Sequence, residues 1–154
     1  MLLVILSACV LMAATMAVHA SGISVLMRGL RKLEALPAAR VWPVARTLLR
    51  MIWWLILLHM SEITVWALFY LWRGCIPNAE AAFYFSGVTY TTIGYGDLVL
   101  AKPWRLLGPI EGLMGVLMCG LSTGYFFVVV SLTFQSRHAK AHVLPTTRGA
   151  QRDQ

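Results

Sequence analysis

Charged side chains are scarce in this chain, and their scarcity decides what class of protein it is. Asp, Glu, Lys and Arg make up only 12% of the 154 residues, whereas hydrophobic residues make up 59%, and the mean hydropathy is +0.73. A soluble domain has about a quarter of its residues charged. Because the apolar residues form long blocks, the composition predicts an integral membrane protein rather than a soluble domain.

Negative charge is rarer still, and cysteine is rare as well. Asp and Glu number 6 against 13 Lys and Arg, which gives a net charge of +7. The cations lie beside apolar segments, where they set topology and contact anionic lipid head groups, so lipids and not nucleic acid are the expected partners. The 3 cysteines have no C-x-x-C spacing and predict neither a zinc site nor a disulfide framework.

Groupings that would indicate an enzyme are also missing from the sequence. The 4 histidines lie far apart, at positions 19, 59, 138 and 142. No nucleophile lies beside a base, and no metal-ligand spacing is visible. An enzyme is therefore not expected, and neither a cofactor nor a small-molecule substrate is predicted.

Three apolar blocks are each long enough to span a bilayer, which takes about 20 residues. Residues 1–27 contain no charged side chain and predict a first transmembrane helix, with a secretory signal peptide as the alternative. Residues 51–72 predict a second, with aromatic anchors at its ends that include Tyr70. Residues 105–134 predict a third, which crosses with tilt.

The segments between and after these blocks are basic. Residues 28–50 are rich in arginine, and Pro37 and Pro43 predict short amphipathic pieces at the membrane surface instead of one helix. Residues 135–154 form a polar, basic tail. Short positive segments stay cytoplasmic, so both are expected on the inner side of the cell membrane. The chain would then cross this membrane several times, with its N-terminus outside.

A shorter helix and a glycine-rich segment lie between the second and third blocks. Asn78 is a good N-cap for a helix over residues 79–90, which at about 18 Å is too short to span a bilayer. The sequence TTIGYGD follows at residues 91–97. This pattern predicts a re-entrant pore segment, because non-helical backbone at that depth must be enclosed by protein or line water.

The run Thr92-Ile93-Gly94-Tyr95-Gly96-Asp97 resembles the selectivity filter of the potassium channel pore family, T-V/I-G-Y/F-G followed by Asp. The resemblance covers residues 51–134. It implies an all-α membrane protein with three transmembrane helices, a pore helix and a filter, assembled as a homotetramer. It also implies that the backbone carbonyls of Thr92, Ile93, Gly94 and Tyr95, with the Thr92 hydroxyl, coordinate K⁺ as the transported ion. Gly94 and Gly96 would supply the unusual backbone angles, and the side chains of Ile93 and Tyr95 would pack behind the filter.

The same resemblance assigns supporting residues around the filter. Thr91 begins the segment, and Asp97 at its outer mouth would accept a hydrogen bond from Tyr84, which stands where many relatives have Trp. Val88 replaces a Glu that one bacterial relative carries behind its filter. Glu111 is the candidate substitute, expected to support the pore helix through a bond to one of four residues, Tyr84, Ser86, Thr89 or Tyr90.

Gating residues are assigned with alternatives left open. Matching the inner helix places a hinge glycine near Gly115, with Gly120 as a second candidate and close helix packing as the competing role. Three plausible cavity-facing residues are Val116, Cys119 and Thr123. His59 and Glu62, one turn apart in the second span, form either a structural pair that bonds another helix or a pH-sensitive pair.

Passive, potassium-selective conduction is the function that these features predict. The alternative is a regulatory subunit that joins a larger channel without forming its own pore. A secondary transporter is disfavoured because no second half of the chain repeats the single pore segment.

Overall fold

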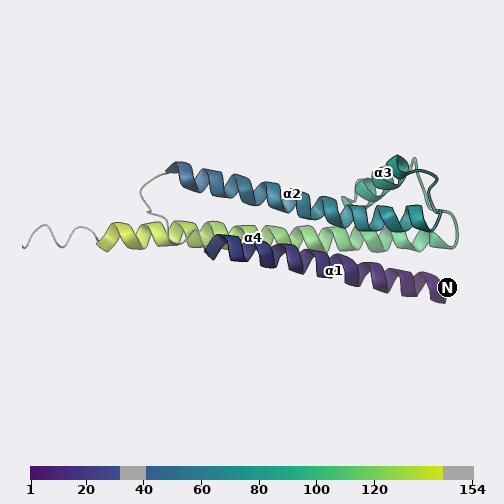
Figure 1. The fold of residues 1–154 in the computed structure, drawn as a ribbon, viewed down its shortest axis with the longest axis horizontal. Coiled ribbons are helices and arrows are strands. Elements are labelled where there is room, and N and C mark those ends of the chain that lie inside the picture. The colour runs from purple at the N-terminus through teal and green to yellow at the C-terminus, as the bar shows by residue number, and fades with distance from the viewer. Residues whose placement is uncertain (32–40, 144–154) are drawn as a thin grey trace, which may run out of the picture.

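The computed structural model describes the backbone of residues 1–31 and 41–143, and the side chains of residues 1–29 and 45–131. This part of the chain is helical and contains no strand. Figure 1 shows its four α-helices, which are α1 (Leu2–Arg31), α2 (Val41–Trp72), the short α3 (Ala79–Tyr90) and α4 (Leu107–Val143). A 3₁₀ turn, η1 (Trp104–Leu106), directly precedes α4. The predicted all-α fold is confirmed.

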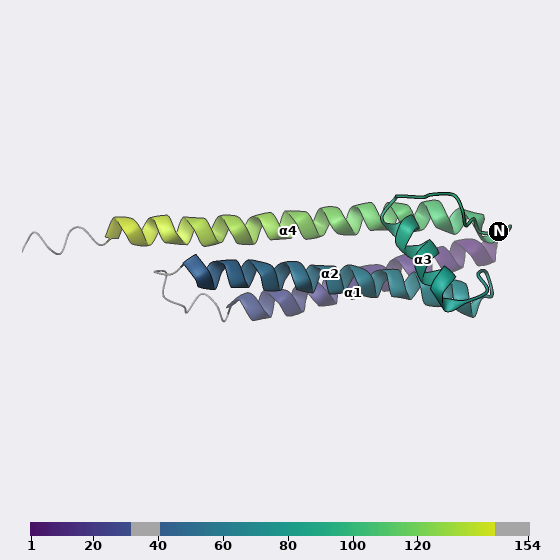
Figure 2. The ribbon, with the colours of Figure 1, turned by 90° about the horizontal axis from the view of Figure 1, so that it is seen from above.

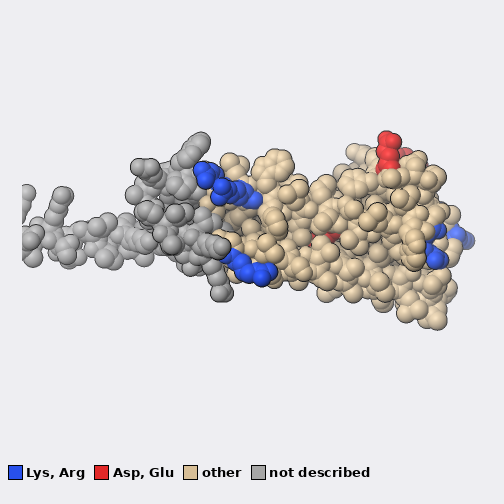
Figure 3. All heavy atoms as spheres, in the orientation of Figure 1, with Lys and Arg blue, Asp and Glu red and all other residues tan. Residues whose placement is uncertain are grey.

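Three of these helices are long and apolar enough to cross a membrane. Their candidate spans are Leu2–Gly29, Ala45–Trp72 and Trp104–Ser131. They lie side by side in both Figure 1 and Figure 2, and α3 sits at the end of the bundle where the N-terminus of α1 also lies. On the face drawn in Figure 3, Lys and Arg side chains gather at the two ends of the part whose side chains are described. The three predicted spans are therefore present.

The helices extend beyond the predicted spans, and residues 41–50, expected among short surface pieces, belong to the same helix as the second span. α1 continues to Arg31, and α2 begins at Val41, ten residues before the predicted span. Pro43 lies in the first turn of α2, where a missing N–H breaks no intrahelical bond. Pro37 lies outside the described residues. α4 likewise runs on to Val143, through the first part of the predicted tail.

α1 packs on α2 and α4 through one face. Its buried residues are spaced by three or four, which is the spacing of a single helical stripe, and they are Val4, Ala8, Leu11, Thr15 and His19. The Trp66 indole of α2 donates to Thr15 Oγ1 at 2.9 Å. The Trp54 indole donates to the Gly22 carbonyl at 3.0 Å. α1 is thus docked along the length of α2 by both apolar and polar contacts.

Candidate functional site

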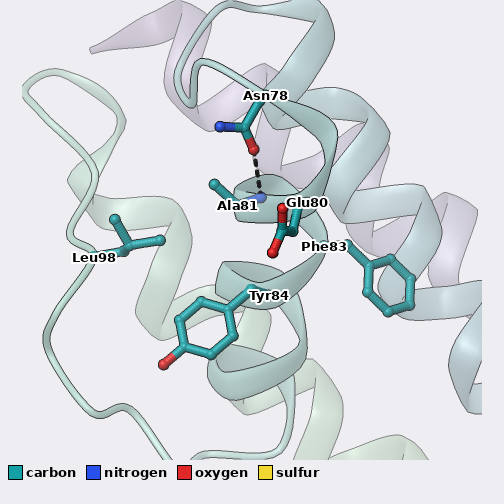
Figure 4. Close-up of a pocket in the computed structure, with 6 residues that line it drawn as sticks. All are labelled: Asn78, Glu80, Ala81, Phe83, Tyr84 and Leu98. Carbon is teal, nitrogen blue, oxygen red and sulfur yellow. Dashed lines mark hydrogen bonds between the residues drawn. The ribbon is translucent and has the colours of Figure 1, made fainter.

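The pore segment begins with a well-capped helix. Asn78 has extended backbone, and its side-chain Oδ1 accepts from the Ala81 N–H at 2.7 Å, as Figure 4 shows. Glu80 lies in the first turn, where a carboxylate is favoured by the helix dipole. α3 therefore has the bounds predicted from the sequence, Ala79–Tyr90. It packs on α2 and α4, which fix the position of its C-terminal end.

Hydrogen bonds to backbone carbonyls attach the start of the filter segment to the C-terminal end of α3. The N–H and the hydroxyl of Thr91 both donate to the Gly87 carbonyl, at 3.1 Å and 2.7 Å. The Gly94 N–H reaches back to the Val88 carbonyl at 3.0 Å. The first half of the segment is therefore anchored on α3 by Thr91 and Gly94.

The glycines of the segment have the backbone angles that their positions require. Gly94 has a φ of 54° and Gly96 a φ of 80°, both in the left-handed region that side chains resist. Thr92 was not expected to join them, yet its φ is 60°. For a β-branched residue this conformation costs of order 1–3 kcal/mol. Such strain is typical of functional segments that the surrounding structure holds in place.

Within one chain the filter segment has little cover. Ile93 is 55% exposed and Tyr95 is 69% exposed. The side chains expected to pack behind the filter are therefore uncovered when a single chain is considered. A segment at bilayer depth cannot keep non-helical backbone open to lipid.

The predicted hydrogen bond at the outer mouth is present. Tyr84 of α3 donates its hydroxyl to Asp97 Oδ2 at 2.8 Å. This bond is the main reason that the pKa of the Tyr84 phenol is raised above its ordinary value, with burial a smaller cause. Tyr84 also borders an open hollow between α3 and the segment after the filter, whose other side carries Leu98 (Figure 4). The bond ties the far end of the filter to the helix that precedes it.

Glu111 of α4 supports the pore helix from behind. Its carboxylate is fully buried and accepts from the hydroxyl of Ser86 on α3, one of the partners predicted for it. Its second partner is Tyr70 of α2, which donates at 2.8 Å. Tyr70 is fully buried, so its assignment as an interfacial anchor is wrong. Glu111 thus links α2, α3 and α4 at one point.

A second buried carboxylate, Glu62 of α2, gathers a larger set of donors than expected. His59 and Glu62 share a face, as predicted, with His59 Nδ1 3.3 Å from Glu62 Oε2. His19 of α1 adds its Nδ1 at 2.7 Å from Glu62 Oε1. The Tyr90 hydroxyl donates to Glu62 and lies 3.0 Å from His59 Nδ1. His19 was missed because its partner lies 43 residues away on another helix.

The inner helix contacts the pore helix at a glycine that was assigned as a hinge. A Cβ on Gly115 would lie 1.9 Å from the Tyr90 carbonyl oxygen, whereas a Cβ on Gly120 would meet nothing within 4 Å. Close packing is therefore the role that the structure gives Gly115. The three predicted cavity residues share one exposed face of α4, which carries Val116, Cys119 and Thr123.

Comparison with known proteins places most of this arrangement in one family. An ion-channel family model, Ion_trans_2, matches residues 45–132, more than half of the 154 residues. The match includes α3, the filter segment and most of α2 and α4, whereas α1 lies outside it. No curated protein and no solved structure matches the chain. The chain therefore belongs to an ion-channel family whose domain, of the two-helix potassium-channel type, occupies residues 45–132.

Proposed function

We propose that this ion-channel chain conducts K⁺ selectively and passively through a homotetrameric pore. The observation that carries the proposal is the filter run Thr92–Asp97, which leaves the end of a capped pore helix with Gly94 and Gly96 in left-handed backbone. Carbonyl rings from four such segments replace the hydration shell of a monovalent cation. One chain supplies one carbonyl strand, so a closed ring requires four.

Exposed surfaces support the assembly. The filter side chains Ile93 and Tyr95 are uncovered in one chain, and so is the α4 face that carries Val116, Cys119 and Thr123. Neighbouring subunits around a fourfold axis would cover the filter from behind and enclose the α4 face as a water-filled cavity. The C-terminal end of α3, with its negative dipole end, would then favour a cation in that cavity.

Charge distribution supports an orientation with the filter and the N-terminus outside the cell. The N-terminus of α1 lies at the α3 end of the bundle (Figure 1). Arg28 lies near the C-terminal end of α1, and Arg46 and Arg50 lie near the N-terminal end of α2, at the other end of the bundle. Positive segments remain cytoplasmic and contact anionic lipid head groups. The cytoplasmic end would therefore also carry the C-terminal tail.

Ion flux into liposomes that contain only this chain tests the proposal. We expect uptake down a K⁺ gradient and little uptake down a matched Na⁺ gradient. Gly94→Ala places a Cβ in left-handed backbone, at a cost of about 1–2 kcal/mol per chain, and should abolish selective flux. Gly29→Ala, where a Cβ meets nothing within 4 Å, is the matched control. Tetramers that pass no ion, or pass Na⁺ as readily as K⁺, would contradict the proposal, and a silent tetramer would favour a regulatory subunit.

A further inference from the structure

The buried cluster around Glu62 has a composition that the conduction pathway does not explain. One donor atom each from His19, His59 and Glu62 lies within 4.8 Å of the other two. His19 comes from α1, outside the matched family domain, and His59 and Glu62 come from α2. Three ligand-type side chains therefore converge from two helices in the middle of the predicted spans.

The charge of this cluster needs a partner. Glu62 is fully buried within a membrane-spanning helix, where an ionised carboxylate is costly unless a cation faces it. Among the described residues, only the two histidines come within ion-pair distance of Glu62. No described Lys or Arg reaches it. Neutral histidines carry no positive charge to balance the Glu62 carboxylate. A bound cation would supply that charge.

The donor set indicates which cation would fit. Two imidazole nitrogens and one carboxylate oxygen suit Zn²⁺ and related transition metals, whereas Mg²⁺ and Ca²⁺ prefer oxygen ligands. Tetrahedral zinc places its ligand atoms about 3.3 Å apart, which small movements of these side chains would reach. His19 Nε2 is buried and has no partner among the described residues. Because His19 Nδ1 is the nitrogen that faces Glu62, at 2.7 Å from Oε1, Nδ1 is the atom that would take the metal.

We propose that His19, His59 and Glu62 bind Zn²⁺ and so fasten α1 to α2 behind the pore helix. The Tyr90 hydroxyl, which contacts both Glu62 and His59, holds the ligands in orientation, as outer-shell partners do in zinc sites. The site stands apart from K⁺ selectivity, because its ligands lie on α1 and α2 and none belongs to the filter.

The proposed metal site can influence the pore through Tyr90. Tyr90 is the last residue of α3, directly before Thr91, and its carbonyl faces Gly115 on α4. A metal that orders the Tyr90 side chain therefore acts on the point where the pore helix, the inner helix and the filter meet. Zinc occupancy is expected to stabilise the assembly and to change the K⁺ flux that it supports.

Metal binding to the purified full-length chain tests the inference directly. After chelation, equilibrium dialysis against Zn²⁺ should show one tightly bound ion per chain, and Co²⁺ in its place should give the intense visible bands of a tetrahedral site. His19→Gln, which removes one ligand, should weaken Zn²⁺ binding at least about tenfold. The matched control His138→Gln/His142→Gln removes the tail histidines and should keep the affinity.

His19→Cys keeps a zinc ligand on α1 and separates metal binding from the mere packing of His19. It should bind Zn²⁺ and shift the Co²⁺ bands toward those of a thiolate ligand. No tight Zn²⁺ site on the wild type would overturn the inference. A site lost in the tail variant but kept in His19→Gln would do the same, because the metal would then sit on the tail. These readouts do not depend on ion flux, so the inference can fail while the channel function stands.

Discussion

The hydroxyl of Tyr84 is one atom on which the geometry of the outer mouth depends. It donates to Asp97 at the outer end of the filter segment. That bond raises the pKa of the phenol above its ordinary value of 10.0. Tyr84→Phe removes the donor and leaves the ring. We expect reduced K⁺ selectivity in liposome flux, because Asp97 loses its tie to α3. Tyr125→Phe, whose hydroxyl has no partner among the described residues, is the control and should behave as wild type.

The same bond predicts a response to alkaline pH. Because the pKa of Tyr84 is raised in the folded state, the stabilisation is complete below the ordinary phenol value and is lost as the pH rises through the raised value. Selective flux of the wild type should therefore fall only above about pH 10. Tyr84→Phe should lack that transition. A transition of equal size in both proteins would assign it to another group.

Glu111 allows a sharper comparison of two substitutions. Glu111→Gln keeps an acceptor for Tyr70, and its amide can donate to Ser86 while the Ser86 hydroxyl donates to the Ile63 carbonyl. Its stability should therefore remain close to that of the wild type. Glu111→Ala leaves the buried Tyr70 hydroxyl without its acceptor, at about 1–3 kcal/mol, whereas Ser86 keeps the Ile63 carbonyl. Denaturation of the purified protein in mixed micelles measures the stability of both variants. If the alanine variant were as stable as the glutamine variant, the linking role of Glu111 would have to be abandoned.

At the scale of helices, Gly115 decides how closely α4 approaches the pore helix. A Cβ at this position would lie 1.9 Å from the Tyr90 carbonyl. Gly115→Ala must therefore separate α3 from α4, and overpacking of this kind typically costs 1–3 kcal/mol. We expect lower thermal stability and lower K⁺ flux.

Gly120→Ala provides the contrast, since a Cβ there meets nothing within 4 Å and alanine favours helix by up to about 1 kcal/mol. If Gly115 were chiefly a hinge, Gly115→Ala would slow opening without lowering stability. Thermal denaturation of the two variants beside their single-channel opening rates separates the two roles.

Local signals predicted the elements well, and contacts between helices account for what was missed. The start of α3 followed from the Asn78 cap, and its end followed from the glycine-rich segment that begins at residue 91. The start of α2 was not predicted. Proline breaks a helix in its interior but is tolerated in the first turn, and the sequence alone did not show that Pro43 lies in the first turn. His19 and Glu62 are 43 residues apart in the sequence. Helical periodicity relates only residues three or four apart, so it could not predict their contact.

At the scale of the whole molecule, the position of α1 constrains how the proposed tetramer can be arranged. The buried stripe of α1 faces α2 and α4 of its own chain, and Cys9 lies on an exposed part of α1. Cys119 lies on the exposed face of α4, which we place at the central cavity. If α4 lines the axis, α1 must lie at the outside of the tetramer.

Spin labels at these two cysteines measure that arrangement. Each single-cysteine chain is made by changing the other two cysteines to alanine, with Cys75 removed from both. Distances between labels at position 119 should be much shorter than those at position 9, and each set should show the two spacings of a square, an edge and a diagonal. The square pattern follows from fourfold symmetry alone, whereas the order of the two sets follows from the packing of α1 on α2. Longer distances at position 119 than at position 9 would place α1 nearer the axis and remove the cavity from the α4 face. A single spacing at both positions would instead indicate a dimer, in which one pair of filter strands cannot surround an ion.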